Sequence, residues 1–313
     1  MEHILVLFPT HAHHRAQLRA AGGDAVFCFD DETPSEEFLS RVTMVLGRPP
    51  LELLPRLPAL AHLQLNSAGV EPYASALPDH VGLTNASGAY GPGIAEHGLG
   101  MVLTLMKKLH RYRDNQRDSR WEPLGTVTSL EEARVLVVGL GDLGRCFARK
   151  VHALGARVTG IKRTPGQAPD YCETLYTLDK LDDCLPQADI VYLSLPDTPD
   201  TQGLFSRERI KKMKPGAILI NVGRGNAVDL DALCDALEEG RLSGAGVDVT
   251  DPEPLPQTHR AWQVEDLLIT PHVSGGFFLP QTHDRIVSIC ADNVGRFCRH
   301  EPLRNTVDRK LLY

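Results

Sequence analysis

The sequence has 313 residues, of which 42% are hydrophobic and 23% charged, a balance typical of a globular protein with a sizeable core and without long disordered stretches. A net charge of -7 disfavours nucleic-acid binding, because phosphate backbones recruit clustered cations. The seven cysteines form no CxxC pair, so they predict neither a disulfide framework nor a structural zinc site and fit a reducing cytoplasm. No segment is long and apolar enough to predict a membrane span.

Residues 1–95 predict a small α/β unit. Short apolar runs at 4–8, 42–46 and 63–65 indicate buried strands. Ser35 followed by Glu36 and Glu37 is typical of a helix start. His11, His13 and His14 follow the first run in a predicted loop, and because no acidic residue accompanies them at a fixed spacing, we expect no metal there.

A helix is predicted over residues 96–117, where apolar residues recur at three- and four-residue spacing. Polar residues take over from Lys107 onward, so the far end is expected to meet solvent or a partner chain. This helix is expected to link two domains.

Strands and helices then alternate. The predicted strands cover 134–138, 157–161, 190–195, 217–221, 244–249 and 267–270, and the predicted helices cover 143–154, 207–213 and 229–239. Such alternation favours right-handed crossovers and a doubly wound parallel sheet. The fold class is therefore α/β, with a Rossmann domain over 96–277. A helix over 285–297 ends the alternation, so residues 278–313 are expected to complete the smaller, flavodoxin-like domain of residues 1–95.

A glycine-rich turn follows the strand at 134–138. Its pattern is GxGxxG, and it reads Gly139-Leu140-Gly141-Asp142-Leu143-Gly144. Between a strand and a helix, these glycines allow a tight turn, close approach of a pyrophosphate and close helix packing. A dinucleotide site is the prediction, with an unliganded turn or an S-adenosylmethionine site as the alternatives.

The next strand end distinguishes between the two nicotinamide cofactors. An NAD site usually has an acidic residue there for the ribose hydroxyl, but this chain has Lys162, Arg163 and Thr164. Two cations and a hydroxyl suit a 2′-phosphate, which favours NADP(H) over NAD(H). The alternative is a solvated surface loop.

Polar side chains follow three later strands, in segments that contain Arg224, Glu253 and His272. Ligands of an open parallel sheet bind at the carboxyl ends of its strands, so these side chains are expected to meet there. Arg can hold a carboxylate and polarise a carbonyl, and His can donate a proton near neutral pH. A carboxylate beside the imidazole would orient it. The hypothesis is reduction of a 2-oxo acid to a 2-hydroxy acid, although each residue alone is more often structural.

These segments resemble the D-isomer-specific 2-hydroxyacid dehydrogenase family. The resemblance rests on the glycine turn and on three stretches, which are Lys214 through Gly225, Gly246-Val247-Asp248-Val249 with Glu253-Pro254, and Thr270-Pro271-His272. It implies Arg224 as the substrate clamp, His272 as the acid/base and Glu253 as its partner.

The resemblance also implies contacts that the pattern alone does not give. Besides the glycine turn and the cations, the cofactor would contact Leu195, Pro196, Val222, Gly223, Asp248, His272 and Gly275. The substrate carboxylate would bind the amides of a loop at Ser67, Ala68 and Gly69, for which an ordinary turn is the alternative.

The family is usually dimeric, so we expect a homodimer through the helix at 96–117. Trp121 matches a position that reaches the partner's substrate pocket, or else packs in a hinge of its own subunit. Thr250 and the Gly276-Phe277-Phe278 run depart from the family pattern, which puts the shape of the substrate pocket in doubt.

Glyoxylate and hydroxypyruvate are the substrates favoured. The alternatives are an NAD-dependent D-3-phosphoglycerate or other D-2-hydroxyacid dehydrogenase, and a non-enzymatic cofactor sensor that resembles the family's co-repressors.

Overall fold

A computed structural model describes residues 1–277 and 279–310. The chain forms two compact units. Unit 1 comprises Met1–Tyr90 and the stretch that begins at Gly276, and unit 2 comprises Gly91–Gly275. The sequence placed these divisions near residues 95 and 277. The first division lies earlier because one continuous helix begins at Gly91. Phe278 and residues 311–313, which fall in the predicted C-terminal return, lie outside the described residues.

Unit 1 contains a parallel sheet in the order β2-β1-β3-β4-β5. Its elements are β1 His3–Val6, α1 Ala12–Gly22, β2 Val26–Cys28, α2 Glu36–Arg41, β3 Met44–Leu46, η1 Leu51–Arg56, β4 His62–Gln64, α3 Tyr73–Ala76, β5 Gly82–Thr84 and α10 Pro280–Cys298. This strand order is that of flavodoxin-like folds.

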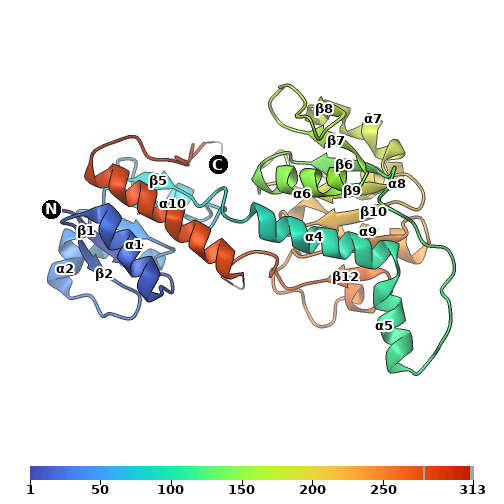
Figure 1. The fold of residues 1–313 in the computed structure, drawn as a ribbon, viewed down its shortest axis with the longest axis horizontal. Coiled ribbons are helices and arrows are strands. Elements are labelled where there is room, and N and C mark those ends of the chain that lie inside the picture. The colour runs from blue at the N-terminus through green and yellow to red at the C-terminus, as the bar shows by residue number, and fades with distance from the viewer. Residues whose placement is uncertain (278, 311–313) are drawn as a thin grey trace. The chain divides into compact units, whose positions relative to one another are not determined.

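Helices α1 and α10 lie side by side in unit 1 (Figure 1). Ile286, Val287, Cys290 and Val294 repeat at helical spacing along α10 and are buried in one cluster with Ile4 and other residues of unit 1. The prediction of a loop at His13 and His14 was wrong, because both residues belong to α1. The polar composition of α1 hid its helical period.

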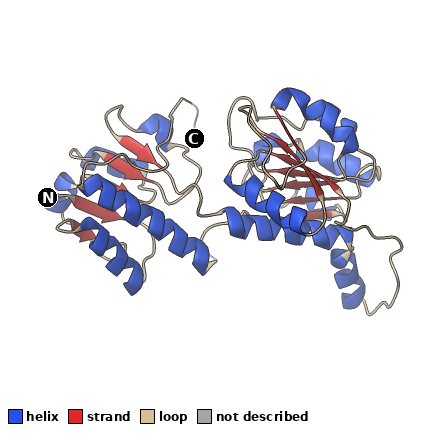
Figure 2. Ribbon diagram, turned by 45° about the horizontal axis from the view of Figure 1, so that its top comes forward, coloured by secondary structure: helices blue, strands red, loops and turns tan. Residues whose placement is uncertain are grey.

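Unit 2 contains a parallel sheet in the order β12-β11-β10-β9-β6-β7-β8. Its elements are α4 Gly91–Met106, α5 Leu109–Arg117, β6 Arg134–Val138, α6 Asp142–Ala153, β7 Arg157–Ile161, β8 Thr174–Tyr176, η2 Leu178–Lys180, α7 Leu181–Cys184, η3 Leu185–Gln187, β9 Ile190–Leu193, α8 Arg207–Lys212, β10 Ile218–Asn221, η4 Gly225–Ala227, α9 Leu230–Glu238, β11 Gly244–Val247, η5 Arg260–Gln263 and β12 Leu267–Ile269. Helices cover both faces of this sheet (Figure 2). The order is that of a Rossmann fold with one more strand, and it reverses between β6 and β9.

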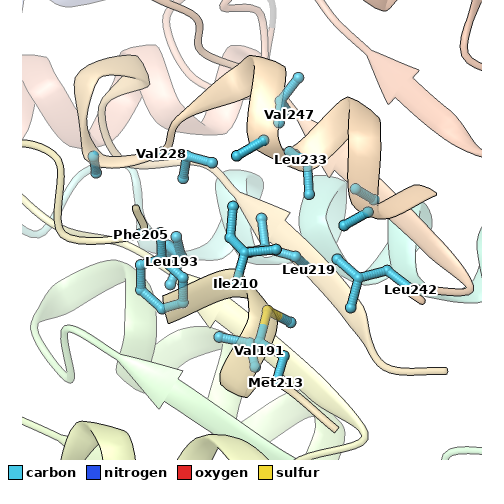
Figure 3. Close-up of a cluster of buried hydrophobic side chains, with 14 of the residues drawn as sticks. Val191, Leu193, Phe205, Ile210, Met213, Leu219, Val228, Leu233, Leu242 and Val247 are labelled. Carbon is cyan, nitrogen blue, oxygen red and sulfur yellow. The ribbon is translucent and has the colours of Figure 1, made fainter. Parts of the chain in front are cut away.

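The core beside β9 and β10 fixes the strand ends that carry the site. Ile210 of α8 and Leu233 of α9 pack with Leu219 of β10 in a buried cluster (Figure 3). Every residue of both strands is buried, and all but the last residue of β10 are apolar or aromatic, as expected where helices bury both faces of a parallel sheet.

The single helix predicted over 96–117 is two helices. α4 ends at Met106, and Lys108 has a φ of 54°, which turns the chain before α5. The side chains of Lys107 and Lys108 hold this turn by donating to the carbonyls of Thr128 and Leu124, both at 2.6 Å. The described part of the chain has no helix with both the length and the apolarity needed to cross a membrane.

Candidate functional site

The turn between β6 and α6 has the shape that a pyrophosphate requires. Gly139 has a φ of 98°, and a Cβ on it would lie 2.6 Å from the carbonyl oxygen of Ser194. A Cβ on Gly144 would lie 2.2 Å from the carbonyl oxygen of Gly139, so Gly144 lets α6 begin close to β6. A Cβ on Gly141 would meet nothing within 4 Å, so the space beside it is open. Because the N-terminus of α6 presents amide donors and partial positive charge, the turn suits an anion.

The side chains of Asp142 and Leu143, the next two residues of this turn, lie in different surroundings. The side chain of Asp142 accepts a hydrogen bond from the amide of Gly91 at 3.2 Å, so its carboxylate turns toward the start of α4. Leu143 is half-buried in the first turn of α6. The backbone of both residues therefore remains the part nearest to a phosphate at the helix start.

The cations that follow β7 lie next to the glycine turn. Ile161 pairs with Val138 in the parallel sheet, and its carbonyl accepts from the amides of Gly139 and Leu140, both at 3.0 Å. Lys162 comes directly after Ile161 and is half-buried, whereas Arg163 and Thr164 are exposed. The position of Lys162 is therefore set by the same strand pair that sets the turn.

The segments after β9 and β10 pack backbone against backbone. A Cβ on Gly223 would lie 2.6 Å from both the amide nitrogen and the carbonyl oxygen of Leu195. Leu195 and Val222 are buried, and Pro196 is exposed. The predicted cofactor contacts at these four positions are thus adjacent in the structure.

Arg224 sits in a turn that a buried amide side chain holds in place. Asn221, at the end of β10, is 1% exposed. Its Nδ2 donates to the carbonyl of Arg224 at 2.9 Å, and its Oδ1 accepts from the amide of Gly223 at 3.1 Å. The Arg224 Nη1 donates to the carbonyl of Gly223 at 2.9 Å. The sequence reading missed Asn221, although a polar residue closing an apolar strand was a usable signal.

The Arg224 turn packs tightly against the loop that carries Glu253. A Cβ on Gly225 would lie 2.0 Å from the carbonyl carbon and oxygen of Thr250. The amide of Thr250 donates to Oε1 of Glu253 at 3.1 Å. Two of the three predicted segments are therefore in direct contact.

Glu253 and His272 form the pair that the sequence predicted. His272 Nδ1 lies 2.9 Å from Oε2 of Glu253, and their side chains are 55% and 39% exposed. The amide of His272 donates to the carbonyl of Asp248 at 2.7 Å, and its φ is 53°. Because Glu253 engages Nδ1, Nε2 is the ring nitrogen left for a reacting group.

The Asp248 carboxylate anchors the His272 loop. It is buried and accepts hydrogen bonds from the Thr270 hydroxyl at 2.5 Å, from the amides of Val273 and Ser274 at 3.0 and 3.1 Å, and from the Ser274 hydroxyl. Nε2 of His97 on α4 lies 3.0 Å from the Thr270 hydroxyl. The structure thus gives Asp248 a positioning role besides its predicted place near the cofactor. Gly275 follows this loop as the last residue of unit 2.

In unit 1, the loop after β4 has three successive amides without a hydrogen-bond partner among the described residues. The carbonyl of Ser67 accepts from the amide of Ala86 at 2.9 Å, that of Ala68 from Asn85 Nδ2 at 2.9 Å, and that of Gly69 from the Ser67 hydroxyl at 2.7 Å. Within the described residues, the amides of Ser67, Ala68 and Gly69 have no hydrogen-bond acceptor. Three such amides in succession are a suitable contact for an anion.

Trp121 follows α5 and is fully exposed. The two alternatives for its indole, the partner's substrate pocket and a hinge of its own subunit, both stay predictions. Leu109, Tyr112 and Val127 are further exposed apolar side chains of the same region.

The chain matches known proteins over most of its length. Residues 99–274 match the model of the D-isomer specific 2-hydroxyacid dehydrogenase NAD binding domain. A glyoxylate/hydroxypyruvate reductase A from Serratia proteamaculans is 31% identical over 245 residues, which are 76% of this chain and 77% of that protein. The glyoxylate reductase/hydroxypyruvate reductase of Mus musculus is 31% identical over 66% of this chain and 65% of its own.

Solved structures give the same result for the fold. A D-isomer specific 2-hydroxyacid dehydrogenase family protein from Aeromonas salmonicida is 32% identical, with a TM-score of 0.87 over 98% of this chain and 99% of that chain. A D-isomer specific 2-hydroxyacid dehydrogenase from Xanthobacter autotrophicus in complex with NADPH and MES is 30% identical, with a TM-score of 0.84 over 100% of this chain and 99% of that chain.

Proposed function

This chain belongs to the D-isomer-specific 2-hydroxyacid dehydrogenase family, and we propose that it uses NADPH to reduce a small 2-oxo acid such as glyoxylate or hydroxypyruvate, with D stereochemistry where a stereocentre forms. The observation that carries the proposal is the His272–Glu253 pair at 2.9 Å, in a loop held by Asp248. Membership of the family and the names of its relatives support an NAD(P)-dependent oxidoreductase rather than a pure cofactor sensor.

The reaction adds a hydride to the carbonyl carbon and a proton to the carbonyl oxygen. The bound nicotinamide supplies the hydride. His272 donates the proton from Nε2, while Glu253 fixes the orientation of the ring through Nδ1. The guanidinium of Arg224 binds the substrate carboxylate and stabilises the charge that develops on the carbonyl oxygen.

The preference for NADPH follows from charge at the end of β7. Lys162 lies beside the glycine turn, and no acidic side chain stands at positions 162–164 to hold a ribose hydroxyl. A 2′-phosphate would gain ion pairs with Lys162 and Arg163, and NAD would not. The relative from Xanthobacter autotrophicus, whose structure contains NADPH, supports this choice.

A panel of 2-oxo acids with NADPH and NADH in parallel tests the proposal. Glyoxylate, hydroxypyruvate and 3-phosphohydroxypyruvate are compared by the loss of absorbance of the reduced nicotinamide. We expect turnover of the two small acids with NADPH. A marked preference for 3-phosphohydroxypyruvate with NADH would establish the phosphoglycerate dehydrogenase alternative instead.

Variants assign the roles. His272→Gln should lower turnover by about 10²- to 10⁴-fold, because it removes the proton donor. Arg224→Ala should lower kcat/KM by about 10²- to 10³-fold. Lys162→Ala should raise the KM for NADPH and not that for NADH. Lys211→Ala, at an exposed cation of α8, is the control. An Arg224→Ala enzyme with unchanged kinetics would refute the substrate assignment.

The exposed apolar side chains around α5 support the proposal of a homodimer. A second copy would bury Trp121, Tyr112 and Leu109, which are now exposed. Trp121→Ala should shift the oligomer toward monomers in light scattering, and it should raise the KM for the 2-oxo acid if the indole reaches the partner's site. A monomeric wild type would contradict this proposal.

A further inference from the structure

Unit 1 contains a cluster of histidines that shares no residue with the dehydrogenase site proposed in unit 2. His13 and His14 lie in the first turn of α1, and Asp284 lies near the start of α10. Oδ1 of Asp284 lies 2.9 Å from Nε2 of His14 and 3.4 Å from Nε2 of His13. The donor atoms of these three residues all lie within 4.8 Å of one another. The acidic partner that the sequence spacing did not show is therefore supplied by the neighbouring helix (Figure 1).

His283 packs beside this cluster and has an unpartnered nitrogen. Its side chain is 5% exposed, and its ring centroid lies 4.3 Å from that of His14 and 5.6 Å from that of His11. Among the described residues, its Nε2 has no hydrogen-bond partner. A buried polar nitrogen that lacks a partner is costly.

We propose that His13, His14 and Asp284 bind one divalent transition cation of the Zn²⁺ class. Imidazole nitrogen with one carboxylate is the donor set that such ions prefer, and Mg²⁺ or Ca²⁺ would require more oxygen. Donors bound at about 2.0 to 2.1 Å in a tetrahedron lie roughly 3.3 Å apart, close to the separations in the cluster. His13 and Asp284 are exposed, which gives the ion a path of entry.

Binding requires one rearrangement within the cluster. The amide of His11 donates to Nδ1 of His14 at 3.3 Å, which leaves the ring proton on Nε2 facing Asp284. Coordination through Nε2 moves that proton to Nδ1 and releases the long contact with His11. The ion then replaces the proton between His14 and Asp284 and joins α1 to α10. Because the unfolded chain does not hold these residues together, the ion stabilises the folded state of unit 1.

The test measures metal binding directly, without the dehydrogenase reaction. The full chain is stripped with a chelator and titrated with Co²⁺, whose visible spectrum reports the ligand type, and with Zn²⁺ by calorimetry. Thermal unfolding is followed with and without Zn²⁺. We expect one ion per chain, a Co²⁺ spectrum without thiolate charge transfer, and a rise in Tm with Zn²⁺.

Variants at the exposed ligands distinguish this site from others. His13→Gln and Asp284→Asn should each weaken binding by at least about tenfold and reduce the rise in Tm. His80→Gln, at an exposed histidine of unit 1, and His272→Gln, in the proposed active site, should bind as the wild type does. The proposal would be overturned if His13→Gln and Asp284→Asn bound the ion as tightly as the wild type. A Co²⁺ spectrum with thiolate charge transfer, or no saturable binding by the wild type, would also overturn it. None of these outcomes affects the proposed dehydrogenase function.

Discussion

The contact between Gly225 and Thr250 makes a sharp test of how the site is assembled. In Gly225→Ala, the new methyl carbon would start 2.0 Å from the carbonyl of Thr250. Packed carbons do not approach backbone atoms closer than about 3 Å, so the Arg224 turn and the Glu253 loop must separate by roughly 1 Å. A displacement of that size costs about 10²-fold in rate, which corresponds to about 2.7 kcal/mol of transition-state stabilisation.

Steady-state reduction kinetics with a 2-oxo acid measure this effect as kcat/KM. Gly240→Ala is the control, because a Cβ at Gly240 would meet nothing within 4 Å, although its φ of 68° strains any residue with a side chain. It lies after α9, at the far end of that helix from η4. Gly240→Ala should cost about 1 to 2 kcal/mol of stability through strain and leave kcat/KM unchanged. A folded Gly225→Ala enzyme with wild-type kcat/KM would show that the contact does not position Arg224 and Glu253.

Three further predictions concern the stability of the two units, and the last of them includes a control substitution. Burial lowers the pKa of His62 from 6.5 to about 4, so as the pH falls this residue takes up a proton in the unfolded chain before it does so in the folded chain. About 2 to 3 kcal/mol of stability is therefore lost between pH 7.5 and 4.5. Denaturant curves of His62→Gln should lack this part of the loss, and equal losses in the variant and the wild type would refute the prediction. Asp248→Asn leaves an amide group facing donors and should cost about 1 to 3 kcal/mol in thermal unfolding and lower turnover, whereas unchanged turnover would deny Asp248 its positioning role. Leu219→Ala, at a side chain with 0% exposure, should lower the free energy of unfolding by about 2 to 5 kcal/mol. Leu154→Ala, at 48% exposure, is the control and should lower it by less than about 0.5 kcal/mol. Similar values for both variants would contradict the packing in Figure 3.

The parallel sheet of unit 2 was predictable because its strands are long apolar runs with turn residues between them. β6 and β7 coincide with the predicted ranges. In unit 1, strands of three residues such as β2 and β5 are too short to show a period, and they were not predicted. α4 and α5 were merged because Leu109 continues the apolar spacing of α4 and no glycine or proline marks the turn that the backbone makes at Lys108.

Residue chemistry and spacing along the chain indicated the glycine turn, the cations after β7 and the trio of Arg224, Glu253 and His272. These signals are local, since each depends on the residues beside a predicted strand end. The sequence also carried enough of the family pattern to predict the reaction class.

Tertiary structure alone decided which distant residues meet. His272 Nδ1 pairs with Glu253, which is 19 positions away in the chain. The His272 loop is anchored on Asp248, about two dozen positions away, and His14 meets Asp284, 270 positions away. Such contacts depend on how strands and helices pack, and packing leaves no mark at a fixed spacing in the chain. For that reason His272 and its partner Glu253 were predicted from the sequence, whereas the acidic partner of His14, Asp284, was found only in the folded protein.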